Sequence, residues 1–433
     1  MNLFHLIYLP ILLYALKNYH RAFLLYAIIR PLLNFQILLY SESGIPQIFL
    51  ETFMNTFMLT CVCCNYIINK PQNSISFPLK QVFFVYTIVM CASCLVSTMA
   101  LSQEISIIYQ TTLNGFVYIY LLWRELKTEQ DIKFYIKGVM IFSCFVMIYG
   151  FFELLNKGDN PLLLYEGILN PKNKIVSGAA DEIIDSYRGI KVRSIFFSSL
   201  GYGAYISVVL PFFYYIDIQY KRIWDSTKWK KIIFMSALLL ALLSAQGRGA
   251  ILACIISLLF LLKFKNILRI SLFLPFFIIL FRGMIFQSLG VILSIFIPDK
   301  QIEAGGSSMT MRLMQFALTI QVWEKRPWLG YGPQGASHWI EQDIGLLGME
   351  SIWLKVLVNF GIIGVFSQIY LYCSTIKLGI GKSKRYVIGS LLAWIALETT
   401  TVSWGFDQYI SFFIGFILIA YRLELLNFKG EKT

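Results

Sequence analysis

The sequence predicts an all-α protein, a polytopic transmembrane helical bundle of about 12–13 spans with two long external loops. Of its 433 residues, 57% are hydrophobic and only 14% are charged, and the mean hydropathy is +0.66. Soluble domains hold about 25% charged residues. Apolar runs of roughly 17–25 residues recur along the chain, and a helix of that length crosses about 30 Å of hydrocarbon. The runs do not alternate apolar and polar residues as the strands of a membrane barrel do, so helices are predicted.

The expected spans follow one another with short connections, apart from two long gaps. They lie near residues 2–16, 22–40, 48–69, 78–101, 104–123, 132–155, 194–216, 231–246, 249–263, 266–282, 350–376, 386–403 and 406–427. No small-residue cleavage site follows the first apolar run, which predicts an uncleaved first span. Thirteen spans would place the N-terminus outside and twelve would place it inside, and the sequence leaves this choice open.

The distribution of basic residues predicts the orientation in the membrane. Formal net charge is +13, and the Lys and Arg residues gather in short connections at 124–137, 217–231, 263–269 and 377–385. Such clusters are retained on the cytoplasmic side. Topology therefore accounts for the charge, and no nucleic-acid partner is expected. The resulting divisions are N-terminal helices 1–155, a first external loop 156–193, central helices 194–282, a second external loop 283–349 with amphipathic helices, and C-terminal helices 350–433.

Several common catalytic and binding motifs are missing from the sequence. The eight Cys lie in or beside apolar runs and lack the second half of a zinc site. No P-loop, dinucleotide fingerprint, HExxH sequence or serine nucleophile elbow is found. Their absence argues against a nucleotide-driven pump and against a soluble catalytic domain, but it leaves a transporter open.

Arg248 lies between two short apolar segments, in Gly247-Arg248-Gly249. Each segment has only about fifteen residues, so the turn between them is expected at or below the headgroup level on the outer face. An arginine there is costly without an anionic partner and is a functional candidate by default. The alternative is that its long side chain reaches the lipid phosphates.

Arg193 closes the first long external loop, with Arg188 and Lys191 just before it. Basic residues on the external face oppose the usual charge bias. Guanidinium groups bind phosphate with two hydrogen bonds, so a lipid pyrophosphate is a suitable ligand for them. The alternative is ion pairing within the loop, with Asp181, Glu182 or Asp185.

The second external loop supplies Arg312 and His338. Arg312 lies in a run whose apolar residues recur at helical spacing as far as Trp323, and this helix is expected to end before Pro327. Arg312 either binds substrate or belongs to the solvated face of an interfacial helix. His338 lies in a Gly-rich stretch, where it is either a catalytic or substrate-contacting group or an incidental loop residue.

Glu350 begins a predicted span that also carries two glycines. Positions 350, 354, 357, 361 and 364 fall on one helical stripe, so Glu350 is expected to share a face with Gly361 and Gly364. Glycines allow close packing, which would direct the carboxylate into the bundle. A partly desolvated carboxylate of raised pKa is suited to act as a base. The alternative is a charge that favours the helix dipole.

In their order along the chain, these elements resemble the superfamily of O-antigen ligases and Wzy-type O-antigen polymerases, over roughly residues 190–370. The resemblance rests on Arg193 before a span, the segment 244–250, Arg312 with Pro-Trp-Leu-Gly-Tyr-Gly at 327–332, and Gly-Ile-Ile-Gly at 361–364. Ligases of this superfamily carry a His, then Asn, Ser or Gln, nine residues, and Gly-x-x-Gly. Here Glu350-Ser351 precedes nine residues and Gly361. Glu replaces the His that activates the ligase acceptor, which favours a polymerase.

The resemblance implies an enzyme of the bacterial inner membrane, surrounded by membrane lipids, that joins undecaprenyl-pyrophosphate-linked oligosaccharides at the periplasmic face. Arg193, Arg248 and Arg312 are then expected to bind pyrophosphate, with Arg188 and Lys191 in support, and Glu350 and His338 are the catalytic candidates. No cofactor and no metal are expected, because arginines can stabilise the leaving group in place of a cation. The alternatives are an O-antigen ligase that transfers glycan to lipid A core and a flippase for lipid-linked oligosaccharides. The sequence leaves open whether a chain-length regulator binds.

Overall fold

The computed structural model of the chain describes residues 3–32, 38–40, 48–69, 76–97, 99–162, 191–196, 198–224, 226–262, 309–342, 349, 351–400 and 406–430. Helices dominate this part of the chain, which confirms the all-α prediction. The one exception described is a short antiparallel pair, β1 (Leu38–Tyr40) and β2 (Ile48–Phe49), in which Leu38 lies opposite Phe49.

The helices follow the predicted spans closely along most of the described chain. They are α1 (Leu3–Ile29), α2 (Leu50–Asn69), α3 (Lys80–Leu95), α4 (Leu101–Thr111), α5 (Tyr118–Glu125), α6 (Glu129–Leu155), α9 (Ser199–Gln219), α10 (Lys228–Ser244), α11 (Arg248–Leu261), α15 (Met309–Glu324), α16 (Gly335–Gln342), α17 (Ile352–Ile376), α18 (Lys384–Thr400) and α19 (Phe406–Gly430). A π-helical turn, Thr112–Val117, joins α4 to α5. The predicted span at 266–282 lies outside the described residues.

Within the described part of the chain, four helical stretches are long and apolar enough to cross a membrane. They are Leu101–Glu125, Glu129–Leu155, Ser199–Gln219 and Ile352–Ile376, and two shorter apolar helices are Lys80–Leu95 and Arg248–Leu261. Helix α6 exposes large apolar side chains at helical spacing, at positions 141, 145, 148, 152 and 155. A stripe of this kind is suited to lipid rather than water. The chain is therefore an integral membrane protein.

The predicted second span, 22–40, is wrong in its extent. Helix α1 runs through Leu3–Ile29 and contains a kink at Asn18, with φ −147° and ψ 82°. The Asn18 side chain accepts a hydrogen bond from the backbone N–H of Arg21 (3.1 Å), which caps the second half of the helix. The helix ends at Ile29 because Pro31 follows closely and lacks a backbone donor. The kink thus takes the place of the connection expected between two spans.

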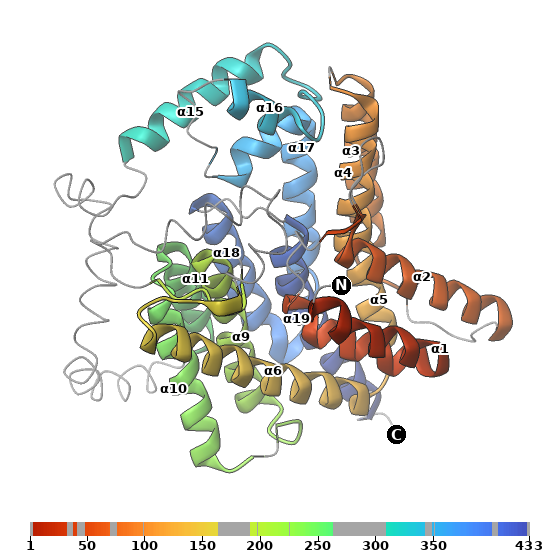
Figure 1. Cartoon of the computed structure of the whole chain (residues 1–433), viewed down its shortest axis with the longest axis vertical. Helices are drawn as coiled ribbons and strands as arrows, with labels where there is room; N and C mark the ends of the chain where they lie inside the picture. Colours follow the sequence, from red (N-terminus) through yellow and green to blue (C-terminus); the bar gives the residue numbers. More distant parts are fainter. Residues whose placement is uncertain are drawn as a thin grey trace. The chain divides into compact units, whose positions relative to one another are not determined.

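The chain forms two compact units. Unit 1 contains Met1–Ser143, Thr319–Ser383 and Trp404–Thr433, and unit 2 contains Cys144–Leu318 and Lys384–Ser403. In unit 1, α17 packs on α3, α1 packs on α2, and α19 packs on α5 and the π-helical turn. In unit 2, α9 packs against both α10 and α11, and α18 lies along α11 (Figure 1).

A buried arginine organises the core of unit 1. Arg30 is 1% exposed. Its Nε donates to Glu51 Oε1 (2.7 Å) and its Nη1 donates to Ser411 Oγ (2.7 Å). Its Nη2 donates to the carbonyl oxygen of Asn114 (2.6 Å), and the guanidinium lies 3.7 Å from the ring centroid of Tyr118. A buried charge is tolerated when it is paired and hydrogen-bonded in this way, so Arg30 joins four segments of unit 1.

Candidate functional site

Unit 2 brings Arg193 to the turn that carries Arg248. The backbone N–H of Val192 donates to the carbonyl oxygen of Ser244 (3.1 Å), the last residue of α10. Gly247 is the N-cap of α11, so Arg248 is the first residue of that helix. A short turn thus separates the two apolar segments, as the sequence predicts. The segment containing Arg193 lies against this turn.

Arg312 reaches the same end of unit 2 through α18. Its Nη2 donates to the carbonyl oxygen of Thr400 (3.2 Å), the last residue of α18. Gly389, near the start of α18, lies against Phe260, near the end of α11. The two helices therefore run antiparallel, and the end of α18 lies beside the start of α11 (Figure 1). Arg193, Arg248 and Arg312, which we call the arginine cluster, thus share one end of unit 2.

Two turns at this end have an uncommon backbone. Ser194 has a φ of 56° and Gln246 a φ of 52°, the left-handed region that residues other than glycine rarely adopt. Such a conformation costs on the order of 1–3 kcal/mol and persists only where surrounding contacts impose it. Residues in strained conformations gather at functional sites, so both turns support the assignment of this end of unit 2.

Two buried carboxyl groups accompany the arginine cluster, and sequence reasoning missed both. Glu153, in the last turn of α6, is 1% exposed, and Glu398, near the end of α18, is 3% exposed. Arg193 is itself only 7% exposed. The signal was present in the sequence, because both Glu residues lie within predicted spans and an ionisable residue there is a functional candidate. The end of unit 2 therefore combines acidic and basic groups away from water.

The other predicted site residues lie outside the arginine cluster or outside the described part of the chain. Glu350 and Arg188 lie outside the described residues. Lys191 is half-buried and precedes Val192. His338 is half-buried on α16, in unit 1, with its backbone N–H donating to the carbonyl oxygen of Gln334 (3.0 Å). Of the predicted site residues, the three of the arginine cluster are therefore the ones that the fold brings to one end of unit 2.

The two glycine motifs meet in unit 1, at a break in α17. Gly361 has φ 62° and ψ −160°, so the helical ladder is interrupted there. The loop at 327–332 pairs with the interrupted backbone. Tyr331 N–H donates to Val358 O (2.9 Å), and Ile362 N–H donates to Pro327 O (2.9 Å). The predicted helical stripe is therefore interrupted at Gly361, because the break changes the direction of the side chains that follow it.

Glycine is required at this junction by close approach of two backbones. A Cβ atom on Gly361 would overlap the carbonyl oxygen of Trp328, and one on Gly330 would overlap that of Val358. Both glycines also have positive φ. Asn359 completes the junction, since its Oδ1 accepts from Ala336 N–H (2.7 Å) and its Nδ2 donates to Pro333 O (2.8 Å). The expected close packing is present, but against a loop rather than a helix.

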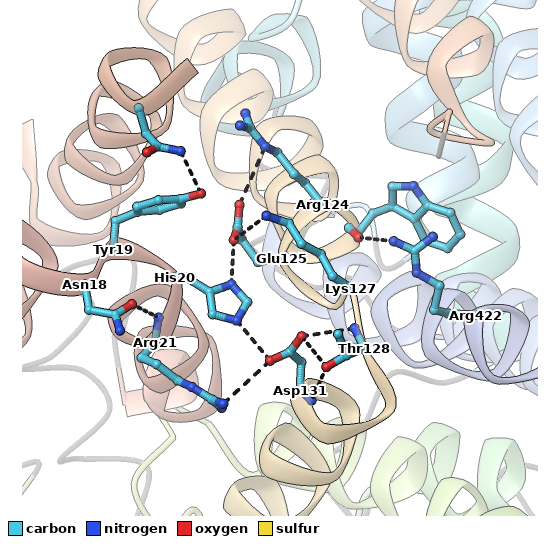
Figure 2. Close-up of polar contacts among 12 residues, drawn as sticks. Asn18, Tyr19, His20, Arg21, Arg124, Glu125, Lys127, Thr128, Asp131 and Arg422 are labelled. Atoms are coloured by element: carbon cyan, nitrogen blue, oxygen red, sulfur yellow. Dashed lines mark hydrogen bonds and ion pairs between the residues drawn. The ribbon is translucent and has the colours of Figure 1, made fainter. Parts of the chain in front are cut away.

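A second polar cluster in unit 1 surrounds His20 (Figure 2). Its Nδ1 lies 2.7 Å from Glu125 Oε2 and its Nε2 lies 2.9 Å from Asp131 Oδ1, so the ring bridges the connection between α5 and α6. Lys127 and Arg21 also approach these carboxylates. The hydrogen bond to Glu125 raises the pKa of His20 although partial burial opposes it. His20 lies outside the candidate membrane spans, and its two ring nitrogens point in opposite directions, each toward one carboxylate. The cluster therefore has a structural role: it connects α1 to the segment between α5 and α6.

Within the described ranges, no group of three or more His, Cys, Asp or Glu side chains could hold a metal ion. Chemically, the end of unit 2 is suited to an anionic group, because arginines offer fixed, always charged donors for phosphate oxygens.

Comparison with known proteins adds one match. Residues 233–369 match the family model Wzy_C, described as O-antigen ligase. The matched segment begins in α10 and ends in α17, so it includes Arg248, Arg312, His338 and the glycine junction, while Arg193 precedes it. No curated protein matches the chain.

Proposed function

The chain carries a Wzy-type O-antigen ligase domain, from a family of membrane glycan-transferring enzymes, and on this premise we propose that it is a surface-polysaccharide polymerase. It joins undecaprenyl-pyrophosphate-linked repeat units at the periplasmic face of the inner membrane. The observation that carries this proposal is the arginine cluster at one end of unit 2.

The chemistry of the transfer matches the charges of that end. A hydroxyl of the acceptor glycan forms a bond to the anomeric carbon of the donor, and the bond from that carbon to the pyrophosphate oxygen breaks. The pair of electrons leaves with undecaprenyl pyrophosphate. Arg193, Arg248 and Arg312 stabilise the negative charge that develops there, and fixed cations in a water-poor site are effective in this role.

A base must take the proton of the attacking hydroxyl. We assign this role to Glu350 from its position before the glycine motif. Glu398 is a second candidate, because it is 3% exposed and lies two residues before Thr400, the partner of Arg312. His338 is proposed to contact the acceptor sugar. A general base held near the attacking hydroxyl typically increases the reaction rate by about 10²–10⁴-fold.

A ligase is the second candidate function. The description of the matching family model favours it, whereas Glu350 in place of a His favours the polymerase. The two activities share the donor and the leaving group and differ in the acceptor. The product therefore distinguishes them.

The test is the lipopolysaccharide ladder of cells that lack the native gene and carry Arg248→Ala or Glu350→Gln protein. We expect a loss of long chains of about 10²-fold, with single repeats still attached to lipid A core and normal protein levels in the membrane. Arg222→Ala, which removes an exposed arginine before α10, is the matched control. Long chains retained on the lipid carrier, with none on lipid A core, would instead identify the ligase, and an unchanged ladder would remove both residues from the mechanism.

A further inference from the structure

The segment that carries Arg193 enters unit 2 in a conformation that its own sequence does not favour. Ser194 has a φ of 56°, and a serine in this region is strained. Residue 193 precedes it directly, so relaxation of Ser194 to negative φ would swing the backbone at Arg193. Some contact must therefore hold this turn.

Glu153 supplies the principal contact. One oxygen, Oε2, accepts hydrogen bonds from two consecutive backbone N–H groups, those of Arg193 (3.0 Å) and Ser194 (2.6 Å). Glu153 is 1% exposed, so water does not compete for these two hydrogen bonds, and a hydrogen bond away from water is electrostatically stronger than one in water. Two adjacent donors aimed at one oxygen fix the orientation of the peptide between them.

Other side chains hold the same turn from different directions. Asn160 Nδ2 donates to the carbonyl oxygen of Ser194 (2.7 Å), and Tyr149 OH donates to Asn160 Oδ1 (2.8 Å). The Ser194 hydroxyl donates to the carbonyl oxygen of Val146 (2.7 Å). All of these groups belong to unit 2, and the turn is fixed on both its N–H and its C=O side.

We propose that Glu153, supported by Asn160, is a positioning residue that holds Arg193 in the arginine cluster ready for a lipid pyrophosphate. This inference rests on the proposed function for the identity of the ligand. Glu153 does not touch the substrate. It acts by keeping the backbone at Arg193 in place before the ligand arrives, so that little ordering remains to be done on binding.

The experiment measures two quantities on full-length protein in detergent or nanodiscs. The first is hydrogen–deuterium exchange of the segment containing the amides of Arg193 and Ser194, and the second is the Kd for undecaprenyl pyrophosphate. For Glu153→Gln we expect faster exchange of this segment and about tenfold weaker binding, since the amide group weakens the two hydrogen bonds that the carboxyl oxygen accepts. For Asn160→Ala we expect the same pattern with about threefold weaker binding, and this variant serves if Glu153→Gln does not fold.

Rescue distinguishes positioning from general stability. Adding Ser194→Gly to Glu153→Gln is expected to restore most of the affinity, because glycine adopts positive φ without strain. Lys157→Gly is the matched control, since Lys157 also has positive φ (57°) but is exposed. Equal rescue by both glycines would overturn the inference, as would unchanged exchange and affinity in Glu153→Gln.

The remaining outcomes separate this inference from the proposed function. Wild-type protein that does not bind undecaprenyl pyrophosphate would defeat the proposed function, while the exchange measurement would still decide whether Glu153 holds the turn. Faster exchange in Glu153→Gln with unchanged affinity would show that the turn does not prepare Arg193 for the ligand, and it would overturn the positioning role.

Discussion

At the scale of single residues, burial of an arginine does not by itself indicate a site. Arg30 is 1% exposed, yet its nitrogens donate to Glu51, Ser411 and Asn114, so its charge serves the core of unit 1. Arg312, in contrast, lies at an end of unit 2 that also carries Arg248 and strained turns. The environment of the charge, rather than its presence in an apolar segment, separates a structural arginine from a binding one.

His20 gives a prediction for the pH dependence of stability. Its pKa is raised in the folded protein, chiefly by the hydrogen bond with Glu125. The stabilisation is therefore complete at a pH below the pKa of this histidine in the unfolded chain, about 6.5. It is lost as the pH rises through the pKa in the folded protein. We expect wild-type protein to lose on the order of 1 kcal/mol of stability across this window, measured as a falling Tm in detergent.

The variant His20→Gln is expected to remove this dependence. Its Tm should be lower than that of wild type below the window and should change little across it. His338→Gln is the matched control, because the described residues include no ion pair for that histidine. An identical fall of Tm in wild type and His20→Gln would show that other groups cause the pH effect.

At the scale of elements, the break in α17 shows why short glycine motifs can be far apart in sequence yet mutually dependent. The loop at 327–332 replaces hydrogen bonds that the helix loses at Gly361. Neither segment satisfies its backbone groups alone, and unpaired buried N–H and C=O groups are costly. The two motifs thus form one structural unit that fixes the path from α15 to α17.

This arrangement predicts that Gly361→Ala is severely destabilising. The added methyl group overlaps the carbonyl oxygen of Trp328, and the positive φ of Gly361 strains any other residue. We expect a loss of roughly 3 kcal/mol or more, seen as a large fall in Tm or in membrane protein level.

Gly415→Ala in α19 is the matched control. Its added methyl group meets only the side-chain carbon Leu122 Cδ2, at 3.1 Å, which can move. Its effect should be small, within about 0.5–1 kcal/mol, because alanine also favours the helix. Comparable losses in both variants would argue against the backbone junction as the cause.

At the scale of the whole molecule, the proposed function requires the two ends of the membrane bundle to face opposite compartments. The basic connections predict that Lys228 and Lys382 are cytoplasmic and that Asp159, after α6, is periplasmic. All three side chains are exposed. In a background without the eight native Cys, Asp159→Cys should react with an impermeant maleimide once the outer membrane is opened. Lys228→Cys and Lys382→Cys should react only after the inner membrane is opened.

Reversal of this labelling pattern would contradict the orientation. Asp159 is close in sequence to Asn160, which holds the turn after Arg193. A cytoplasmic Asp159 would therefore place that turn on the wrong side for a periplasmic polymerase. Because labelling is measured on full-length protein at normal expression levels, the result does not depend on whether the variant is active.

The sequence by itself determined the class of protein and the position of most helices. Long apolar runs have few alternatives in a bilayer, because every backbone group must be paired within the helix. The arginine candidates also followed from the sequence. A charge in an apolar segment is energetically costly, so its presence there makes it a candidate for a function. Glu350 and Arg188, outside the described residues, stay predictions.

Only the tertiary structure decided which of these features come together. The antiparallel packing of α18 on α11 brings Arg312 to the end that carries Arg248, although the two residues are far apart in the chain. The roles of Glu153, of the left-handed Ser194 and of the Gly361 break depend on hydrogen bonds between distant segments. Local periodicity contains no information about such contacts, because they arise only when packed helices bring separate backbones within bonding distance.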